Sequence, residues 1–214
     1  AQRGLITHDI FSHTANGKPW IAHEWLSEVV MALCHQVAGL AGVVILFSLL
    51  AACTFWLLLR LANYYLDDLP ALFCAFVALL LAGSHLLARP HIFTWFFGAL
   101  TLFILSVRRE KLFLLPPLTM VWANFHGGFL VGLMVQAIFI AGFLLEHHPS
   151  PFTVRQWWPI ARQCKKPAFI LLLSVLAALV NPFGIELFLF PFQVSQEVFV
   201  NNIGEWTAPN LREM

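Results

Sequence analysis

The chain has 214 residues, of which 60% are hydrophobic and only 11% are charged, whereas soluble domains carry about 25% charged residues. A globule of this size cannot bury so much apolar surface, so we expect an all-α, polytopic membrane helical bundle. The formal net charge is +1, and no basic patch that would suit nucleic acid is visible. The four cysteines form neither a CxxC pair nor a zinc-binding spacing, so no metal site is predicted from them.

The first 38 residues differ from the rest in being largely polar. They include the turn sequence Asn16-Gly17-Lys18-Pro19. From Trp20 to Val37 apolar residues recur at helical spacing, with polar residues on the other face. Indole rings favour the membrane interface, so residues 1–38 are predicted to form an external loop with an amphipathic interfacial helix.

Residues 39–214 are expected to form a membrane domain of roughly six spans, incomplete at both ends because the sequence begins and stops in polar stretches. The spans are placed at 40–62, 69–88, 92–107, 112–123, 129–145 and 168–180, with a charged loop at 146–166 and a partly apolar, interfacial stretch at 185–200. Two of them, 112–123 and 168–180, are shorter than the ~17–20 residues of a full crossing. Both run into helix-breaking sequence, and irregular backbone at that depth needs a polar cavity around it. We therefore expect broken helices that floor an external cavity; the alternative is that each helix continues one turn and the cavity is shallower.

The basic residues predict the orientation. Threading these spans through a bilayer puts eight on one side, namely Arg60, Arg108, Arg109, Lys111, Arg155, Arg162, Lys165 and Lys166. Only Arg3, Lys18, Arg89 and Arg212 fall on the other. The positive-inside rule makes the first side cytoplasmic. The histidine-containing clusters then lie on the external face, which is periplasmic in a Gram-negative cell.

Two acidic residues of the first region are candidate catalytic groups. Asp9 in the external loop could act as a general base or hold a metal ion, although aspartate is also common in turns. His23-Glu24 begins like a zinc-protease motif, but Ser27 stands where the second histidine belongs. Glu24 could instead orient a sugar hydroxyl or a divalent cation, or simply favour the first turn of a helix.

His23 and the remaining candidates are predicted to bind substrate. Arg89 and His91 flank Pro90 between two spans, where a planar guanidinium suits a phosphate, unless it only reaches toward lipid headgroups. A second cluster combines polar side chains with a helix break and two glycines that permit close backbone approach; it runs through Asn124, Phe125, His126, Gly127 and Gly128.

The last two candidate clusters lie nearer the C-terminus. Asn181 opens the other break, Asn181-Pro182-Phe183-Gly184. Glu205 and Trp206 pair a carboxylate with a ring that could stack on a sugar or anchor the chain at the interface.

In their order along the chain these pieces resemble bacterial membrane proteins of the GT-C glycosyltransferase superfamily. The resemblance rests on the first-loop sequence from Asp9 to Leu26 and on the clusters around Arg89, Asn124, Asn181 and Glu205. It implies a multispanning enzyme that uses a polyprenyl-phosphate-linked sugar on the external face, with an essential carboxylate in the first external loop. In that superfamily the catalytic aspartate closely follows a first span that this sequence lacks, so the base is either Asp9 or a residue upstream of Ala1.

The sequence thus favours a glycosyltransferase of the bacterial inner membrane. Its partners would be a polyprenyl-phosphate-linked sugar donor and the membrane lipids. No cofactor is firmly implied, and the use of a divalent cation is left as an alternative. A transporter or flippase with a midplane site is the alternative, although no internal inverted repeat supports it. An intramembrane hydrolase is a weaker third, because Gly83-Ser84-His85 lacks the setting of a nucleophile elbow.

Overall fold

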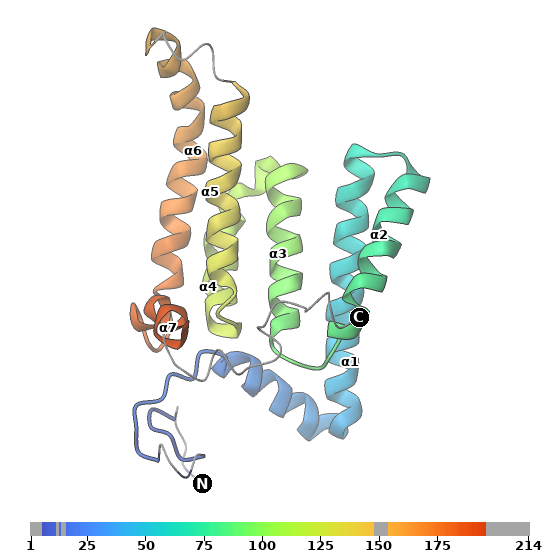
Figure 1. Cartoon of the computed structure of the whole chain (residues 1–214), viewed down its shortest axis with the longest axis vertical. Coiled ribbons are helices and arrows are strands. Elements are labelled where there is room, and N and C mark those ends of the chain that lie inside the picture. The colour runs from blue at the N-terminus through green and yellow to red at the C-terminus, as the bar shows by residue number, and fades with distance from the viewer. Residues whose placement is uncertain (1–5, 12, 14–15, 148–153, 196–214) are drawn as a thin grey trace, which may run out of the picture.

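A computed structural model describes residues 6–11, 13, 16–147 and 154–195 (Figure 1). The predicted all-α fold is confirmed: within these ranges the chain forms helices and no strand, apart from one isolated bridge between His8 and Pro19. In chain order the helices are α1 (Trp25–Tyr65), α2 (Asp68–Ala82), α3 (His91–Ser106), α4 (Leu115–Phe125), α5 (Phe129–Glu146), α6 (Val154–Ala178) and α7 (Glu186–Ser195). Two short 3-10 turns, η1 (Gly83–His85) and η2 (Arg109–Leu114), lie between them.

The first helix, α1, consists of two segments joined at a kink. Ala38 leaves helical geometry at φ −139°, and Gly39 has φ 60°, a conformation that costs glycine little and other residues much. In Figure 1 the first segment slopes across the lower end of the molecule, and the second rises through its height. The kink coincides with the end of the expected interfacial segment.

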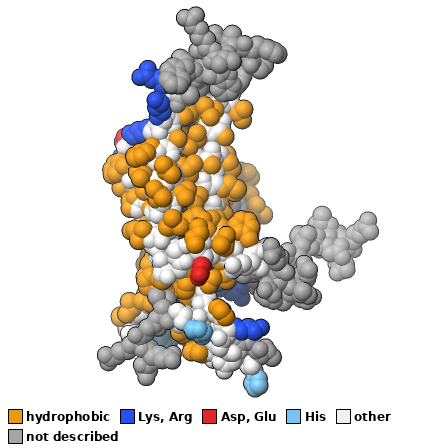
Figure 2. All heavy atoms as spheres, turned by 90° about the vertical axis from the view of Figure 1, so that its left-hand side faces the viewer, with side chains coloured by type: hydrophobic (Ala, Val, Ile, Leu, Met, Phe, Trp, Pro, Cys, Tyr) orange, Lys and Arg blue, Asp and Glu red, His pale blue; other side chains and the backbone are white. Residues whose placement is uncertain are grey.

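The protein is a helical membrane protein. Within the part of the chain that the structure describes, three helical segments are long and apolar enough to cross a bilayer, namely α1, residues 68–85 and α5, and α3 is apolar but shorter. Large apolar side chains face outward along them, as Leu69 and Leu81 do on α2. Figure 2 shows such side chains covering the middle of one face, with lysine or arginine near both ends and histidine near the lower end.

The two spans expected to be short belong to helices of very different length. The helix α4 has 11 residues, as predicted for the span at 112–123. The second span lies in α6, which has 25 residues and begins at Val154 instead of near Ala168, so the prediction of a loop over residues 154–166 was wrong. The helix therefore extends through Arg162, Lys165 and Lys166, which had been assigned to a loop. Charged residues exclude a segment from the bilayer interior, but they do not stop a helix that continues beyond the membrane.

The second expected span also ends early. Regular helix stops at Ala82, and the segment 86–90 is not helical. Pro90 disfavours helical geometry at the residue before it, so the break precedes Arg89. This irregular segment is the connection that leads the chain into α3.

A buried tryptophan organises the packing of α3, α4 and α5. Trp122 is 1% exposed and stacks on Phe97 with ring centroids 5.8 Å apart. Gly98 on α3 and Gly132 on α5 lie against the same ring, and a Cβ atom added at Gly132 would overlap it. This close packing fixes the end of α4 relative to α3 and α5, and so positions the break that follows.

Candidate functional site

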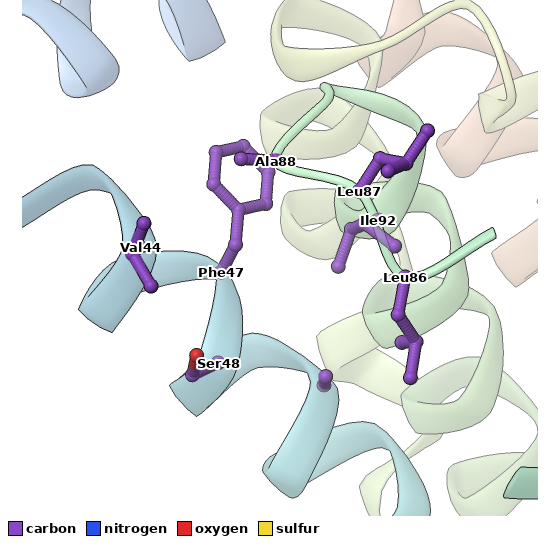
Figure 3. Close-up of a pocket in the computed structure, with 8 residues that line it drawn as sticks. Val44, Phe47, Ser48, Leu86, Leu87, Ala88 and Ile92 are labelled. Carbon is purple, nitrogen blue, oxygen red and sulfur yellow. The ribbon is translucent and has the colours of Figure 1, made fainter. Parts of the chain in front are cut away.

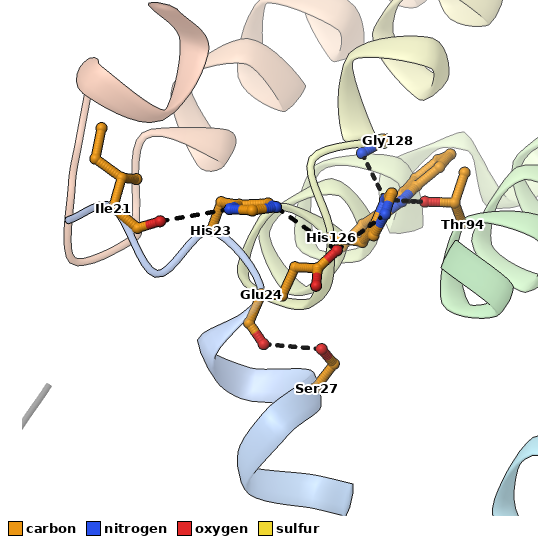
Figure 4. Close-up of polar contacts among 8 residues, drawn as sticks. Ile21, His23, Glu24, Ser27, Thr94, His126 and Gly128 are labelled. Carbon is orange, nitrogen blue, oxygen red and sulfur yellow. Dashed lines mark hydrogen bonds and ion pairs between the residues drawn. The ribbon is translucent and has the colours of Figure 1, made fainter. Parts of the chain in front are cut away.

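The centre of the site is His126, the single extended residue between α4 and the turn into α5. Its Nδ1 accepts a hydrogen bond from the backbone N–H of Gly128 at 2.9 Å and lies 2.8 Å from the Thr94 hydroxyl. Its Nε2 lies 3.2 Å from Oε1 of Glu24 (Figure 4). Because the backbone N–H can only donate, Nδ1 must accept. The neutral imidazole therefore carries its proton on Nε2, and this N–H donates a hydrogen bond to Glu24.

Thr94 completes this arrangement, although the sequence did not single it out. Trp122 Nε1 donates to the Thr94 hydroxyl at 3.1 Å, so the hydroxyl proton is directed to Nδ1 of His126. A chain of four groups thus runs from a buried indole to a carboxylate. One signal in the sequence could have found Thr94: it stands three residues after His91, on the same face of a helix.

Glu24 is the acidic group of the site and precedes the first turn of α1. Burial raises the pKa of its carboxyl. The hydrogen bond from His126 and the neighbouring side chains of His23 and His91 outweigh that effect, so the pKa is lowered overall. The carboxylate is therefore ionised at neutral pH. Its contacts with His126 and His23 both involve Oε1.

His23 links the site to the C-terminal part of the described chain. Its Nε2 lies 3.6 Å from Oε1 of Glu24, and its ring lies against Phe190 of α7, with centroids 4.5 Å apart. The turn at 181–185 thus returns the chain so that α7 lies against His23, just before α1. Segments from three distant parts of the sequence meet here, as the distribution of polar residues had indicated.

Asn124 ties the site together. It is 8% exposed, and its Oδ1 accepts a hydrogen bond from Trp25 Nε1 at 3.0 Å. Its Nδ2 donates to the backbone oxygens of Met120 at 2.8 Å and Val180 at 2.9 Å. Both amide hydrogens are thus used within the protein. A ligand contact of the predicted kind would have to use Oδ1, and the observed bonds join α1, α4 and the end of α6.

Asn181, in contrast, serves its own turn. Its Nδ2 donates to the backbone oxygens of Ala178 at 2.8 Å and Gly184 at 3.3 Å. Its Oδ1 accepts from the backbone N–H of Phe183 at 2.8 Å. These bonds satisfy backbone groups left over where α6 ends. They explain the presence of Asn181 without a substrate.

Arg89 and His91 lie beside the site, at the start of α3. Arg89 is exposed on the irregular segment before the helix. His91 Nε2 lies 3.0 Å from the backbone oxygen of His85, and its charge contributes to the lowered pKa of Glu24.

The residues just before Arg89 and just after His91 line an apolar cavity of about 230 Å³ (Figure 3). One wall comes from α1 and the other from the segment before α3; the lining residues are Val44, Phe47, Ser48, Ala51, Leu86, Leu87, Ala88 and Ile92.

Asp9 is held within the N-terminal loop. It is 6% exposed, and its Oδ1 accepts a hydrogen bond from the backbone N–H of Phe11 at 2.8 Å. Its backbone pairs with Lys18 and Gly17, each at 2.8 Å. These contacts are those of a turn aspartate, and the catalytic role of Asp9 stays a prediction. Glu205 and Trp206 lie outside the described residues.

The described part of the chain contains no group of three or more His, Cys, Asp or Glu side chains arranged to hold a metal ion. What the site offers is an ionised carboxylate, a neutral imidazole in a fixed tautomer, and a cation next to an apolar cavity. This combination can orient a hydroxyl, accept its proton and receive an amphiphilic phosphate.

No protein-family model matches this chain, and no curated protein or solved structure shows significant similarity to it.

Proposed function

We propose that the protein is a membrane glycosyltransferase, which moves a sugar from a polyprenyl-phosphate-linked donor to an acceptor hydroxyl. The hydroxyl oxygen attacks the anomeric carbon, and the bond from that carbon to the phosphate oxygen breaks. The electron pair leaves with polyprenyl phosphate, and the hydroxyl proton passes to a carboxylate. The proposed carboxylate is Glu24, with Asp9 as a second candidate.

The observation that carries this proposal is the contact between Glu24 and His126. It joins a carboxylate of the interfacial helix to a histidine of a helix break 102 positions away, and the lowered pKa keeps that carboxylate ionised. A low pKa makes a weak base in the ground state. The attacking hydroxyl, however, becomes acidic as its bond to the anomeric carbon forms, so a weak base suffices. Among the described residues no contact is seen at Oε2 of Glu24, and this atom would face the hydroxyl.

Arg89, His91 and the neighbouring cavity support a lipid-linked donor. A guanidinium at this position would stabilise the charge that builds on the departing phosphate, which is the main electrostatic demand of such a step. The cavity walls are apolar and lie directly before Arg89 and around Ile92. The first isoprene units of a polyprenyl chain would fit against them while the phosphate reached the cation.

The resemblance implies a location in the bacterial inner membrane, and the basic residues favour an orientation with this site facing the periplasm. The side of the membrane that the site faces is inferred from the number of basic residues on the expected loops. A thiol introduced in place of His91 should react with an impermeant reagent from the outside of intact cells. A thiol in place of Arg109 should react only after the membrane is opened. Reaction of both thiols from the same compartment would contradict this orientation.

The activity is tested by following the release of free polyprenyl phosphate, because that product forms whatever the sugar or acceptor. In membranes that contain the protein and a polyprenyl-phosphate-sugar pool, Glu24→Gln should reduce release by roughly 100-fold or more. Arg89→Ala should reduce it by a comparable factor. Glu28→Gln is the matched control, since Glu28 is exposed one turn further along the same helix. Full release by Glu24→Gln would refute the role of Glu24.

The same assay distinguishes the proposed glycosyltransferase from the alternative, a transporter or flippase. Such a protein would move lipid-linked sugar between leaflets without consuming it. Movement of donor across the membrane without release of polyprenyl phosphate would favour that alternative.

A further inference from the structure

A second groove lies between α3 and α4, at the end of the bundle away from the Glu24–His126 contact. Its volume is about 450 Å³, within the range of roughly 300–1,000 Å³ that is typical of ligand sites. Its walls are mostly apolar, with Leu100, Phe103, Ile104, Leu114, Pro117, Leu118 and Val121 lining it. It begins where α3 passes into η2.

Two cations, Arg108 and Lys111, complete the lining of this groove. Both are exposed and belong to η2 or the residue just before it. Glu110 pairs with Arg108 at 2.5 Å between Oε1 and Nε, so one carboxylate offsets part of the charge. With two cations in the lining and one carboxylate beside them, the mouth keeps a net positive charge.

We infer that this groove binds an anionic phospholipid of the bilayer, with an acyl chain between α3 and α4 and its phosphate at Arg108 and Lys111. Apolar walls that end in cations match a molecule with a hydrocarbon chain below a negative headgroup. Val121 is 37% exposed and Phe103 is partly exposed, so a chain could enter from the side. This inference does not depend on the proposed transferase activity.

The inference is tested by thermal unfolding of the purified protein in mild detergent with added lipid. A ligand that binds only the folded state raises the Tm. Phosphatidylglycerol should raise it by roughly 5 °C. Phosphatidylcholine should do so much less, and glycerol phosphate, which has the charge but no chain, should have no effect.

Two kinds of variant locate the effect in the groove. The double substitution Arg108→Gln and Lys111→Gln should abolish the preference for phosphatidylglycerol. Arg60→Gln, which removes an exposed cation of α1 outside the groove, should retain it. Val121→Trp should fill the groove and abolish the lipid shift without lowering the Tm of the lipid-free protein, so that lost binding is distinguished from lost folding. Equal shifts with both lipids, a shift with glycerol phosphate alone, or a preference that survives the double substitution would each overturn the inference.

Discussion

The two helix breaks of this protein look alike in sequence and do different things. Each has an asparagine beside one or two glycines at the end of an apolar helix. In the break between α6 and α7, Asn181 bonds only to backbone groups within three residues of itself. In the break between α4 and α5, Asn124 and His126 reach α1, α3 and the end of α6. The break between α6 and α7 stabilises only its own turn, whereas the break between α4 and α5 connects distant segments of the chain.

The polar side chains of a helix break thus organise distant segments only when they bond across the fold. A locally satisfied break has no polar group left to recruit a ligand. A break with long-range bonds depends on partners whose positions the whole fold determines, so it can orient a carboxylate. Four experiments follow, from the largest expected effect on stability to the smallest.

The sharpest contrast is between the two asparagines. Asn124→Leu removes three hydrogen bonds and leaves the partly buried indole N–H of Trp25 without its acceptor, so it should lower the free energy of unfolding by about 3 kcal/mol. Asn181→Ala removes bonds that water can replace at a helix end, and should cost about 1 kcal/mol. Thermal unfolding of the two variants in detergent measures both. Equal losses would remove the distinction drawn between the breaks.

The close approach of α5 to α3 is tested at Gly128. A Cβ atom there would overlap the side chain of Thr94, so Gly128→Ala should destabilise the protein by about 2 kcal/mol. Gly127→Ala is a matched control, because a Cβ atom at Gly127 meets nothing within 4 Å. Adding Thr94→Ala to Gly128→Ala should recover part of the lost stability. No recovery would show that the overlap with Thr94 is not the cause.

The tether between the interfacial helix and α4 is tested by Trp25→Phe. This substitution removes one hydrogen bond, 3.0 Å long in the wild type, and should cost about 1 kcal/mol. Trp20→Phe at an exposed position of the preceding loop is the control. If both variants unfold at the same temperature as the wild type, the bond to Asn124 does not hold the interfacial helix.

The smallest effect concerns pH. Because the pKa of Glu24 is lowered in the folded protein, the unfolded chain binds more protons as the solution becomes acidic. Glu24 therefore contributes stability above its unfolded pKa of about 4.3, and this contribution is lost as the pH falls through the folded pKa. Between about pH 5 and pH 3 the Tm should fall less steeply for Glu24→Gln than for the wild type. Identical slopes would mean that the local charges do not favour the ionised carboxylate.

Sequence reasoning went furthest where one residue type determines local geometry. The helical membrane fold follows from composition, the kink in α1 lies at a glycine, and both breaks occur at the Asn and Gly residues that predicted them. The start of α6 could not be found from hydropathy, because that scale reports burial in lipid and this helix extends through a charged segment.

The site was harder to predict, since its roles depend on partners far apart in the chain. Nothing in the local sequence distinguishes Asn124 from Asn181, and Thr94 gains its importance only from the position of Trp122 and His126. Periodicity indicates which face of a helix a residue occupies, but it does not tell which helix lies opposite.

The most direct test of the account is a double-mutant cycle on Glu24 and His126, measured as free energies of unfolding in detergent. The two residues are 3.2 Å apart across the fold. The variants Glu24→Gln and His126→Phe, combined, should show a coupling energy of about 1 kcal/mol or more. The control pair Glu24→Gln and Asn181→Ala should be additive within about 0.5 kcal/mol. Additivity of Glu24 and His126 themselves would contradict the claim that the interfacial helix and the first break form one site.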